Sequence, residues 1–137
     1  MLSKKTKYGI KALIYLANSP ENEPVSILDI STSEDISRKF LESILLLLRK
    51  TGFLSAKKGK GGGYYLRKNP QEIPMAAIIR ILEGPIALLP CVSLNFYEKC
   101  ADCSNEKECK IHNLMIEVRD SALKVLENRT LADIAYK

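Results

Sequence analysis

Apolar residues recur at helical spacing in two segments at the start of the chain. In residues 3–18 the aromatic and aliphatic side chains fall on one face of a helix, which ends at the turn Asn18-Ser19-Pro20. A second, short helix is predicted to begin after Ser26, whose hydroxyl can cap it, with Asp29 at the capping-box position. We therefore expect two helices before residue 36.

A third helix and a hairpin follow. The helix is predicted over residues 37–50, and Gly52 supplies its C-terminal stop. Two short strands, residues 53–57 and 63–67, flank a turn that is rich in glycine and lysine. Three helices followed by a two-stranded hairpin are the order of a winged helix-turn-helix, whose third helix enters the major groove of DNA. The apolar positions that define the third helix are Leu41, Ile44, Leu45 and Leu48.

The second half of the chain contains two helices separated by a polar loop. Pro70 and Pro74 end the hairpin and start a helix over residues 75–83, which Gly84-Pro85 stops. A long helix is predicted from about residue 106 to residue 128, and it carries a heptad-like apolar seam. On so long a helix in a small protein, this seam favours a contact between two copies of the chain over burial within one chain. The seam consists of Ile111, Met115, Val118, Ala122 and Val125.

These elements predict a mainly α fold with two regions. Residues 1–70 form a winged helix-turn-helix with a two-stranded wing, and residues 71–137 form a ligand-bearing loop and a long C-terminal dimerisation helix. Thr130 with Asp133 resembles a capping box for one last short helix. A chain of 137 residues is long enough to bury a real core.

Charge is unevenly distributed along the chain. The net charge is +5, but residues 1–70 carry 13 Lys and Arg against 6 Asp and Glu, whereas residues 71–137 carry 8 against 10. The basic half is therefore the candidate surface for a polyanion. Two alternatives stay open at this point, namely a solvated basic face without a partner and a helical hairpin that binds another protein.

Within the basic half, the third helix and the hairpin turn carry the candidate DNA contacts. The start of the helix would face bases and adjoining phosphates. The Glu42 carboxylate would accept hydrogen bonds from some bases and exclude others by its charge. Lysines on the turn would meet the phosphate backbone, which the glycines allow to approach closely. Phe40 is ambiguous between a core position and a contact with a thymine methyl. The candidate residues are Ser37, Arg38, Lys39, Phe40, Glu42 and Ser43 of the helix and Lys57, Lys58, Lys60 and Gly61 of the turn.

All four cysteines and the single histidine fall within 22 residues of the second half. Their spacing is C-x8-C-x2-C-x5-C-x2-H. Thiolates and imidazole are the ligands that zinc and iron–sulfur clusters select, so a metal or redox centre is the first hypothesis. The predicted long helix would place the last two of them on one face of its first turns. A dithiol or disulfide switch and inert thiols are the alternatives. The residues are Cys91, Cys100, Cys103, Cys109 and His112.

The rest of the sequence argues against secretion, a membrane and catalysis. Lys7 and Lys11 interrupt any apolar stretch of signal-peptide length, so we expect a cytoplasmic protein. The longest apolar run, Ile44–Leu48, has five residues where a membrane span needs about 20. The Walker spacing is absent, and the one histidine is better used as a ligand than in a Ser-His-Asp arrangement, so we do not predict an enzyme.

Four stretches carry a family resemblance. Residues 36–54 and the wing motif Lys58–Tyr64 are the most specific, and residues 7–17 and 78–83 also fit. With them the chain resembles the IscR-type family of winged-helix regulators, which includes the nitric-oxide sensor NsrR and the cysteine regulator CymR. The resemblance covers nearly the whole chain. It implies a homodimeric transcription regulator that binds a roughly palindromic, double-stranded DNA operator.

The resemblance also implies a ligand set for an iron–sulfur cluster, with [2Fe-2S] favoured over [4Fe-4S]. The IscR-like spacing C-x5-C-x2-H is matched by Cys103, Cys109 and His112, and Cys91 would supply the remaining cysteine from a longer loop. Cys100 departs from the pattern as either an alternative fourth ligand or a spare thiol. Such a cluster would sense iron–sulfur status or redox and nitric-oxide stress. An iron–sulfur electron carrier, and a DNA-binding regulator with structural zinc or a thiol switch, are the alternatives.

Overall fold

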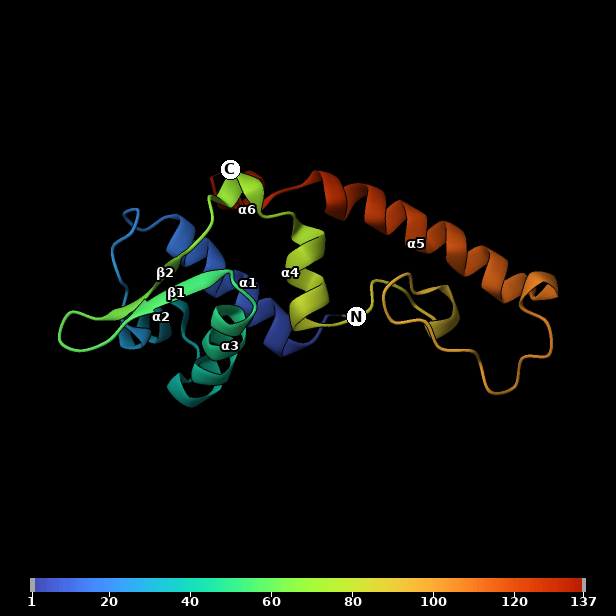
Figure 1. The fold of residues 1–137 in the computed structure, drawn as a ribbon, viewed down its shortest axis with the longest axis horizontal. Helices are drawn as coiled ribbons and strands as arrows, with labels where there is room; N and C mark the ends of the chain where they lie inside the picture. The colour runs from blue at the N-terminus through green and yellow to red at the C-terminus, as the bar shows by residue number, and fades with distance from the viewer. Residues whose placement is uncertain (1, 137) are drawn as a thin grey trace.

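The computed structural model describes residues 2–136, which form an elongated molecule with a winged-helix end and a helical arm (Figure 1). In the winged-helix end three helices precede a two-stranded sheet, so the predicted order of elements and the mainly helical fold class are confirmed. The elements are α1 (Lys4–Ala17), α2 (Ile27–Glu34), α3 (Arg38–Lys50), β1 (Leu54–Lys57) and β2 (Gly63–Leu66).

The second half forms the arm and then returns to the winged-helix end. The longest helix, α5, runs back from the far end of the arm and leads into α6, which contacts α1 (Figure 1). No helix between residues 2 and 136 is long and apolar enough to cross a membrane. The elements are η1 (Pro70–Glu72), α4 (Met75–Leu82), η2 (Pro90–Val92), η3 (Glu106–Glu108), α5 (Lys110–Asn128) and α6 (Leu131–Ala135).

Side-chain caps fix where several helices begin. Ser26 Oγ accepts a hydrogen bond from the Asp29 N–H at 3.1 Å, and Ser37 Oγ accepts one from the Phe40 N–H at 3.2 Å. Thr130 and Asp133 form the predicted capping box at the start of α6. Each cap satisfies backbone donors that the first turn of a helix leaves without an intrahelical partner.

One apolar core joins residues from both halves of the sequence. Its centre lies between α1, α2 and α3, and α4 and α6 add to it from the other side. The base of the arm is therefore anchored in the same core as the helix-turn-helix. The largest fully buried apolar side chains are Leu13, Ile30, Leu41, Ile44, Leu45, Leu48, Leu54, Ile73, Ile78, Leu131 and Val92.

The wing is fixed at its base. The two strands are antiparallel, with Lys57 opposite Gly63. Tyr64 and Val25 exchange two backbone hydrogen bonds of 2.8 Å each, which ties the second strand to the segment before α2. Gly63 is needed there because its φ is 153° and a Cβ would lie 2.1 Å from the Val25 carbonyl oxygen. The wing tip is consequently held in a defined position relative to the helix-turn-helix.

The long helix begins at Lys110, later than the predicted start at about residue 106. Residues 106–108 form the separate turn η3, and Cys109 is extended, with φ −76° and ψ 114°, before α5 begins at Lys110. Cys109 acts as the N-cap, because its sulfur accepts a hydrogen bond from the His112 N–H at 3.4 Å. The prediction that Cys109 and His112 project from one helical face is therefore wrong. Only His112 belongs to the helix.

Candidate functional site

The exposed start of α3 presents a mixed polar surface. Ser37, Arg38 and Lys39 are exposed, and the Ser37 hydroxyl is committed to capping the helix. Arg38 Nε lies 3.9 Å from Glu42 Oε1 one turn later. The Arg38 and Glu42 side chains are 62% and 59% exposed, so water screens the attraction between their charges. Either side chain can leave the other to meet a base or a phosphate.

Phe40 sits between the two roles that the sequence left open. Its ring contacts the Tyr8 ring edge-on, with centroids 5.7 Å apart and an interplanar angle of 88°. The residue nevertheless keeps 39% of its surface exposed. Ser43 on the next turn donates its hydroxyl hydrogen to the Phe40 carbonyl at 2.9 Å. Phe40 is thus a half-covered aromatic residue on the edge of the α3 surface rather than a core residue.

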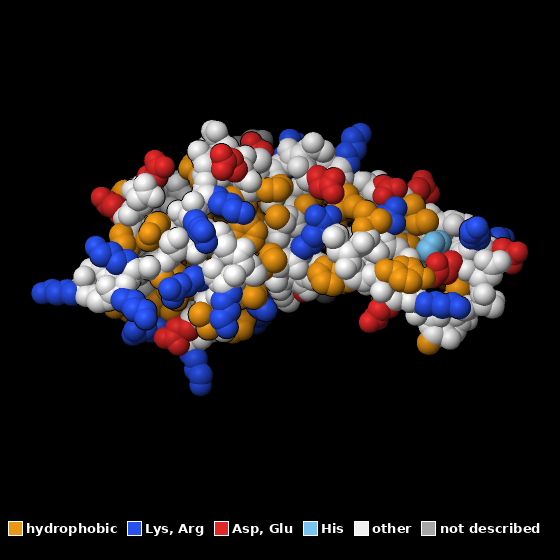
Figure 2. Space-filling model, in the orientation of Figure 1, with side chains coloured by type: hydrophobic (Ala, Val, Ile, Leu, Met, Phe, Trp, Pro, Cys, Tyr) orange, Lys and Arg blue, Asp and Glu red, His pale blue; other side chains and the backbone are white. Residues whose placement is uncertain are grey.

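The wing adds a cationic tip to this surface. Lys57, Lys58 and Lys60 are exposed. The turn between the two strands contains Gly59 and Gly61, whose φ angles are 91° and 75°. Side chains of Lys and Arg gather over the winged-helix end of the molecule, whereas both signs mix on the arm (Figure 2). The charge asymmetry of the sequence therefore becomes an asymmetry between the two ends of the structure. Such a basic end suits a phosphate backbone.

All five soft candidate ligands line one cavity at the far end of the arm. The cavity has a volume of about 560 Å³ and lies between the loop of residues 89–109 and the start of α5. Cys91 is buried at 8% exposure, and its sulfur lies 3.2 Å from His112 Nδ1. Burial, followed by the charges of Glu106 and the neighbouring cysteines, raises the pKa of the Cys91 thiol. The ligands that line the cavity are Cys91, Cys100, Cys103, Cys109 and His112.

Cys100 occupies a different environment from the other ligands. It is exposed, and its sulfur donates to Asp102 Oδ1 at 2.7 Å. That hydrogen bond raises the pKa of the Cys100 thiol, because the carboxylate stabilises the protonated sulfur. Cys103 follows in a turn in which its N–H donates to the Cys100 carbonyl at 3.2 Å. Cys100 is thus the ligand whose thiolate form is least favoured by its hydrogen-bond partner.

The donor set fits an iron–sulfur cluster or zinc by its chemistry. Three thiols and an imidazole, or four thiols, are ligand sets that these centres use. Between residues 2 and 136, however, no three side chains of His, Cys, Asp or Glu lie close enough to hold one metal ion. The described loop therefore gathers the ligands into one cavity without closing them around a common centre.

Several residues that hold this loop were not predicted from the sequence. The Tyr97 hydroxyl donates to the Glu106 carboxylate across the loop, and this contact raises the pKa of Tyr97. Arg119 Nη1 donates to the Val92 carbonyl at 2.9 Å from the middle of α5. Arg119 lies seven residues after His112, so the two share a helical face, and this spacing was the available signal. The contact between Tyr97 and Glu106 had no such signal, because Tyr97 lies in irregular loop and Glu106 begins the separate short turn η3.

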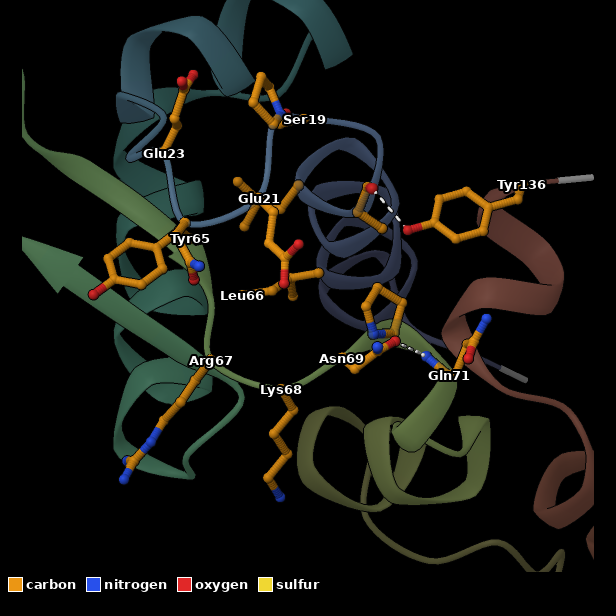
Figure 3. Close-up of a pocket in the computed structure, with 15 residues that line it drawn as sticks. Ser19, Glu21, Glu23, Tyr65, Leu66, Arg67, Lys68, Asn69, Gln71 and Tyr136 are labelled. Atoms are coloured by element: carbon orange, nitrogen blue, oxygen red, sulfur yellow. Dashed lines mark hydrogen bonds between the residues drawn. The ribbon is translucent and has the colours of Figure 1, made fainter.

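A second hollow, of about 300 Å³, lies in the winged-helix end behind the wing (Figure 3). Glu21 reaches into it from the α1–α2 loop, while Arg67 and Lys68 at the exit of β2 point away from it (Figure 3). The Tyr136 hydroxyl closes one edge by donating to the Ala17 carbonyl at 3.0 Å. Neither cysteine nor histidine lines this hollow, so it offers no soft metal ligand.

Comparison with known proteins gives a consistent set of relatives. Residues 2–137 match the model of the Rrf2 family, described as an iron-dependent transcriptional regulator. An rrf2-like HTH-type transcriptional regulator of Rhodobacter capsulatus is 38% identical over 137 residues, which cover 98% of this chain and 91% of that protein. The structure of CymR, the global cysteine regulator of B. subtilis, has a TM-score of 0.80 and 32% identity, covering 99% of this chain and 96% of that one. The structure of T. potens IscR has a TM-score of 0.74 and 31% identity, with coverage of 99% and 86%.

These relatives agree with the geometry of the basic end. They are regulators of transcription and not enzymes, and the similarity covers nearly the whole chain, including the winged helix-turn-helix. DNA binding and the absence of an enzymatic role follow from this membership, and the resemblance inferred from the wing and α3 motifs is confirmed. The chain belongs to the Rrf2 family of transcriptional regulators.

Proposed function

We propose that this regulator is a homodimer that senses iron–sulfur status or redox and nitric-oxide stress through a cluster at the far end of its arm. The observation that carries the proposal is the cavity that all four cysteines and the histidine line. The family description as iron-dependent and the likeness to IscR support it. Cys91, Cys103, Cys109 and His112 would hold the cluster, with Cys100 as the alternative fourth ligand.

The structure supports unequal roles for these ligands. Cys91 is buried, Cys109 caps α5, and His112 lies in its first turn, so three of them are held against the helix. Cys103 is carried by the exposed loop and would close the set by moving toward them. A mixed Cys₃His set is the reason that we favour [2Fe-2S] over [4Fe-4S]. When bound, such a cluster supplies one-electron redox chemistry and reactivity toward oxidants.

The DNA-facing surface would be the start of α3 together with the wing. Arg38, Lys39, Phe40, Glu42 and Ser43 would lie near bases or adjoining phosphates, while Ser37 fixes the helix start. The wing residues Lys57, Lys58, Lys60 and Gly61 would meet the backbone beside the groove. In this division residues 1–70 read DNA and residues 71–137 sense and dimerise. A regulator of transcription works where the chromosome is, so we also propose a cytoplasmic location.

An apolar face of α5 supports the homodimer. Ile111, Leu114, Val118 and Val125 are between 38% and 63% exposed on a helix that packs against its own chain only on the adjacent face. An apolar groove of about 310 Å³ between α4, residues 85–88 and α5 continues this face. Large apolar surface of this kind marks an interaction site. A second copy of α5 would cover it and set the spacing of the two wings on a palindromic operator.

The regulation would be a linkage between cluster and DNA. The cluster would stabilise one arrangement of the ligand loop and the start of α5, and that helix would carry the difference to the dimer contact. Because α6 and α4 root the arm in the winged-helix core, a change in the dimer contact would move the two wings relative to each other.

One alternative has a specific observation in its favour. No three of the described candidate ligands converge on one position, which suits a thiol switch, and the relative CymR is named a cysteine regulator. A structural zinc site would use the same donors. The iron–sulfur electron carrier is less well supported, since it has no use for three lysines on a glycine wing.

Anaerobic purification with an absorption spectrum separates these possibilities. A cluster absorbs in the visible and brings iron and acid-labile sulfide in equal amounts, whereas zinc is colourless and a thiol switch contains neither. Visible absorption that is lost in Cys91→Ser and retained in Ser93→Ala would support the cluster at this site. A colourless anaerobic protein that binds one zinc per chain, or none, would reject it.

A further inference from the structure

The turn that carries Cys91 is buried while the loop after it is not. Cys91, Val92 and Ser93 are between 2% and 8% exposed, and residues 94–102 are all exposed. The turn is closed internally by the Ser93 N–H, which donates to the Pro90 carbonyl at 3.2 Å. What holds this turn against α5 therefore sets where the Cys91 sulfur lies.

Two polar contacts from α5 reach this turn. One is the 3.2 Å contact between His112 Nδ1 and the Cys91 sulfur itself. The other comes two turns further along, where Arg119 Nη1 donates to the Val92 carbonyl at 2.9 Å. The Arg119 side chain is only 15% exposed, and its remaining face is paired with Asp120 at 2.8 Å. A cationic donor on a buried carbonyl is a stronger restraint than a neutral one.

A cluster would engage the first contact directly, because His112 and Cys91 are both candidate ligands. The Arg119 contact uses only the backbone of the turn, so it can persist whether or not the sulfur and the imidazole are occupied. Removing it leaves the buried Val92 carbonyl without this charged donor and favours local opening of the turn.

We propose that Arg119 is a positioning residue that presents the Cys91 sulfur to the ligand cavity by fastening the Val92 carbonyl to the middle of α5. Its relevance to sensing rests on the proposed cluster, but the positioning itself is a property of the protein without a cluster. Arg119 also borders the apolar groove that a second copy would cover. The Arg119 side chain therefore contacts both the turn that carries Cys91 and the groove proposed as part of the dimer contact.

The test is the rate at which iodoacetamide alkylates each cysteine in the reduced, metal-free full-length protein, followed by peptide mass spectrometry. Arg119→Met keeps an unbranched aliphatic stem and removes the guanidinium that donates to the Val92 carbonyl. We expect Cys91 to react on the order of tenfold faster in this variant, while the exposed Cys100 reacts at the wild-type rate. Asp120→Asn is the matched control, since it removes the ion pair and leaves the Val92 contact, and Cys91 should stay protected. Arg119→Lys should restore part of the protection.

Two outcomes would overturn the proposal. An unchanged Cys91 rate in Arg119→Met would show that the contact does not hold the turn. An equal rise at Cys91 and Cys109, or a lost thermal unfolding transition, would show a general structural role instead. A wild-type protein that binds no cluster but protects Cys91 through Arg119 would sink the proposed function and leave this inference standing. In a protein that does bind a cluster, Arg119→Met should also lower the iron retained after gel filtration.

Discussion

At the residue scale, the five candidate ligands differ in how firmly the protein holds them. Cys91 is buried against α5, and Cys109 is fixed by its capping bond to the His112 N–H. Cys100 is exposed and hydrogen-bonded to Asp102. A cluster forms most readily from ligands that are already restrained, because less conformational entropy is lost on binding. This difference favours His112 over Cys100 as the fourth ligand.

The corresponding prediction compares two single substitutions after anaerobic reconstitution. His112→Ala should lose most of the bound iron and sulfide, because the cluster then lacks a restrained ligand, and Cys100→Ala should keep close to the wild-type amounts of both. The measurement is iron and sulfide per chain, with Asn113→Ala as a control on the same turn of α5. Full occupancy in His112→Ala with loss in Cys100→Ala would reverse the assignment. Loss in neither variant would place the fourth ligand outside this loop.

The sequence revealed the identities of these ligands but not their restraints. Spacing placed all five candidates within 22 residues, and the resemblance to IscR-like members singled out Cys103, Cys109 and His112 among them. The interruption of the helix at Cys109 could not be seen, because residues 104–110 contain no proline or glycine that would mark a helix boundary. The Arg119 contact likewise depends on where the turn of residues 90–92 docks in space, which helical spacing can only suggest.

At the element scale, the wing is held by backbone contacts, and we propose that its lysines contact DNA. The bridge between Val25 and Tyr64 fixes its base, and Lys58 and Lys60 stand exposed near its tip. The order of helices and strands was predictable from periodicity and glycine placement. The bridge itself was not, because Val25 lies outside any strand-like pattern in the sequence.

Replacing both wing lysines should weaken DNA binding without changing which sequence is preferred. Each lysine that contacts a phosphate contributes about one unit to the slope of log affinity against log salt concentration. The variant Lys58→Ala/Lys60→Ala should therefore reduce that slope by about two units on specific and random duplexes alike. Lys124→Ala on α5 is the control. An unchanged slope would remove the wing from the interface.

A carboxylate joins two other elements, the start of α1 and the end of α4. Glu83 accepts hydrogen bonds from the Ser3 N–H at 2.5 Å and the Thr6 hydroxyl at 3.2 Å. The Ser3 N–H lowers the pKa of Glu83 below its ordinary value of 4.5, and partial burial opposes this effect. A lowered pKa means that the charged form stabilises the fold above pH 4.5 and that this contribution is lost as the pH falls through the folded-state pKa.

Glu83→Gln should therefore reduce the free energy of unfolding at pH 7 by about 1 kcal/mol or less, since solvent screens a partly exposed carboxylate. The difference from the wild type should shrink as the pH is lowered below 4.5. Urea unfolding at several pH values measures it. Glu72→Gln, an exposed carboxylate in η1, is the control. A difference that grows on acidification would contradict this role for Glu83.

At the scale of the whole molecule, we propose that the apolar face of α5 links sensing to DNA binding. The heptad-like seam was visible in the sequence, and the structure leaves Ile111, Val118 and Val125 exposed. It adds Leu114, which the seam did not include, and the groove beside α4. The extent of the groove depends on how the arm folds back, which no local pattern specifies.

A charge placed on this face should dissociate the dimer. Val125→Glu would bury an unpaired carboxylate in the contact, so sedimentation should show a monomer at micromolar concentration and much weaker binding to a two-half-site duplex. Lys124→Glu places the same side chain about 100° around α5 from Val125, outside the apolar seam, and should remain dimeric. A Val125→Glu protein that sediments as a dimer would move the contact elsewhere.

We propose that occupancy of the cysteine cavity changes the affinity of the protein for DNA. The test first selects operator duplexes from a random library, once with the cluster-loaded protein and once with the cluster-free protein. The affinity of both forms for each selected duplex is then measured anaerobically. We expect affinities that differ at least about fivefold, the lower range of allosteric coupling, and no difference between anaerobic preparations of Cys91→Ser. Equal affinity of the loaded and free wild-type proteins for the operators selected with both forms would contradict it.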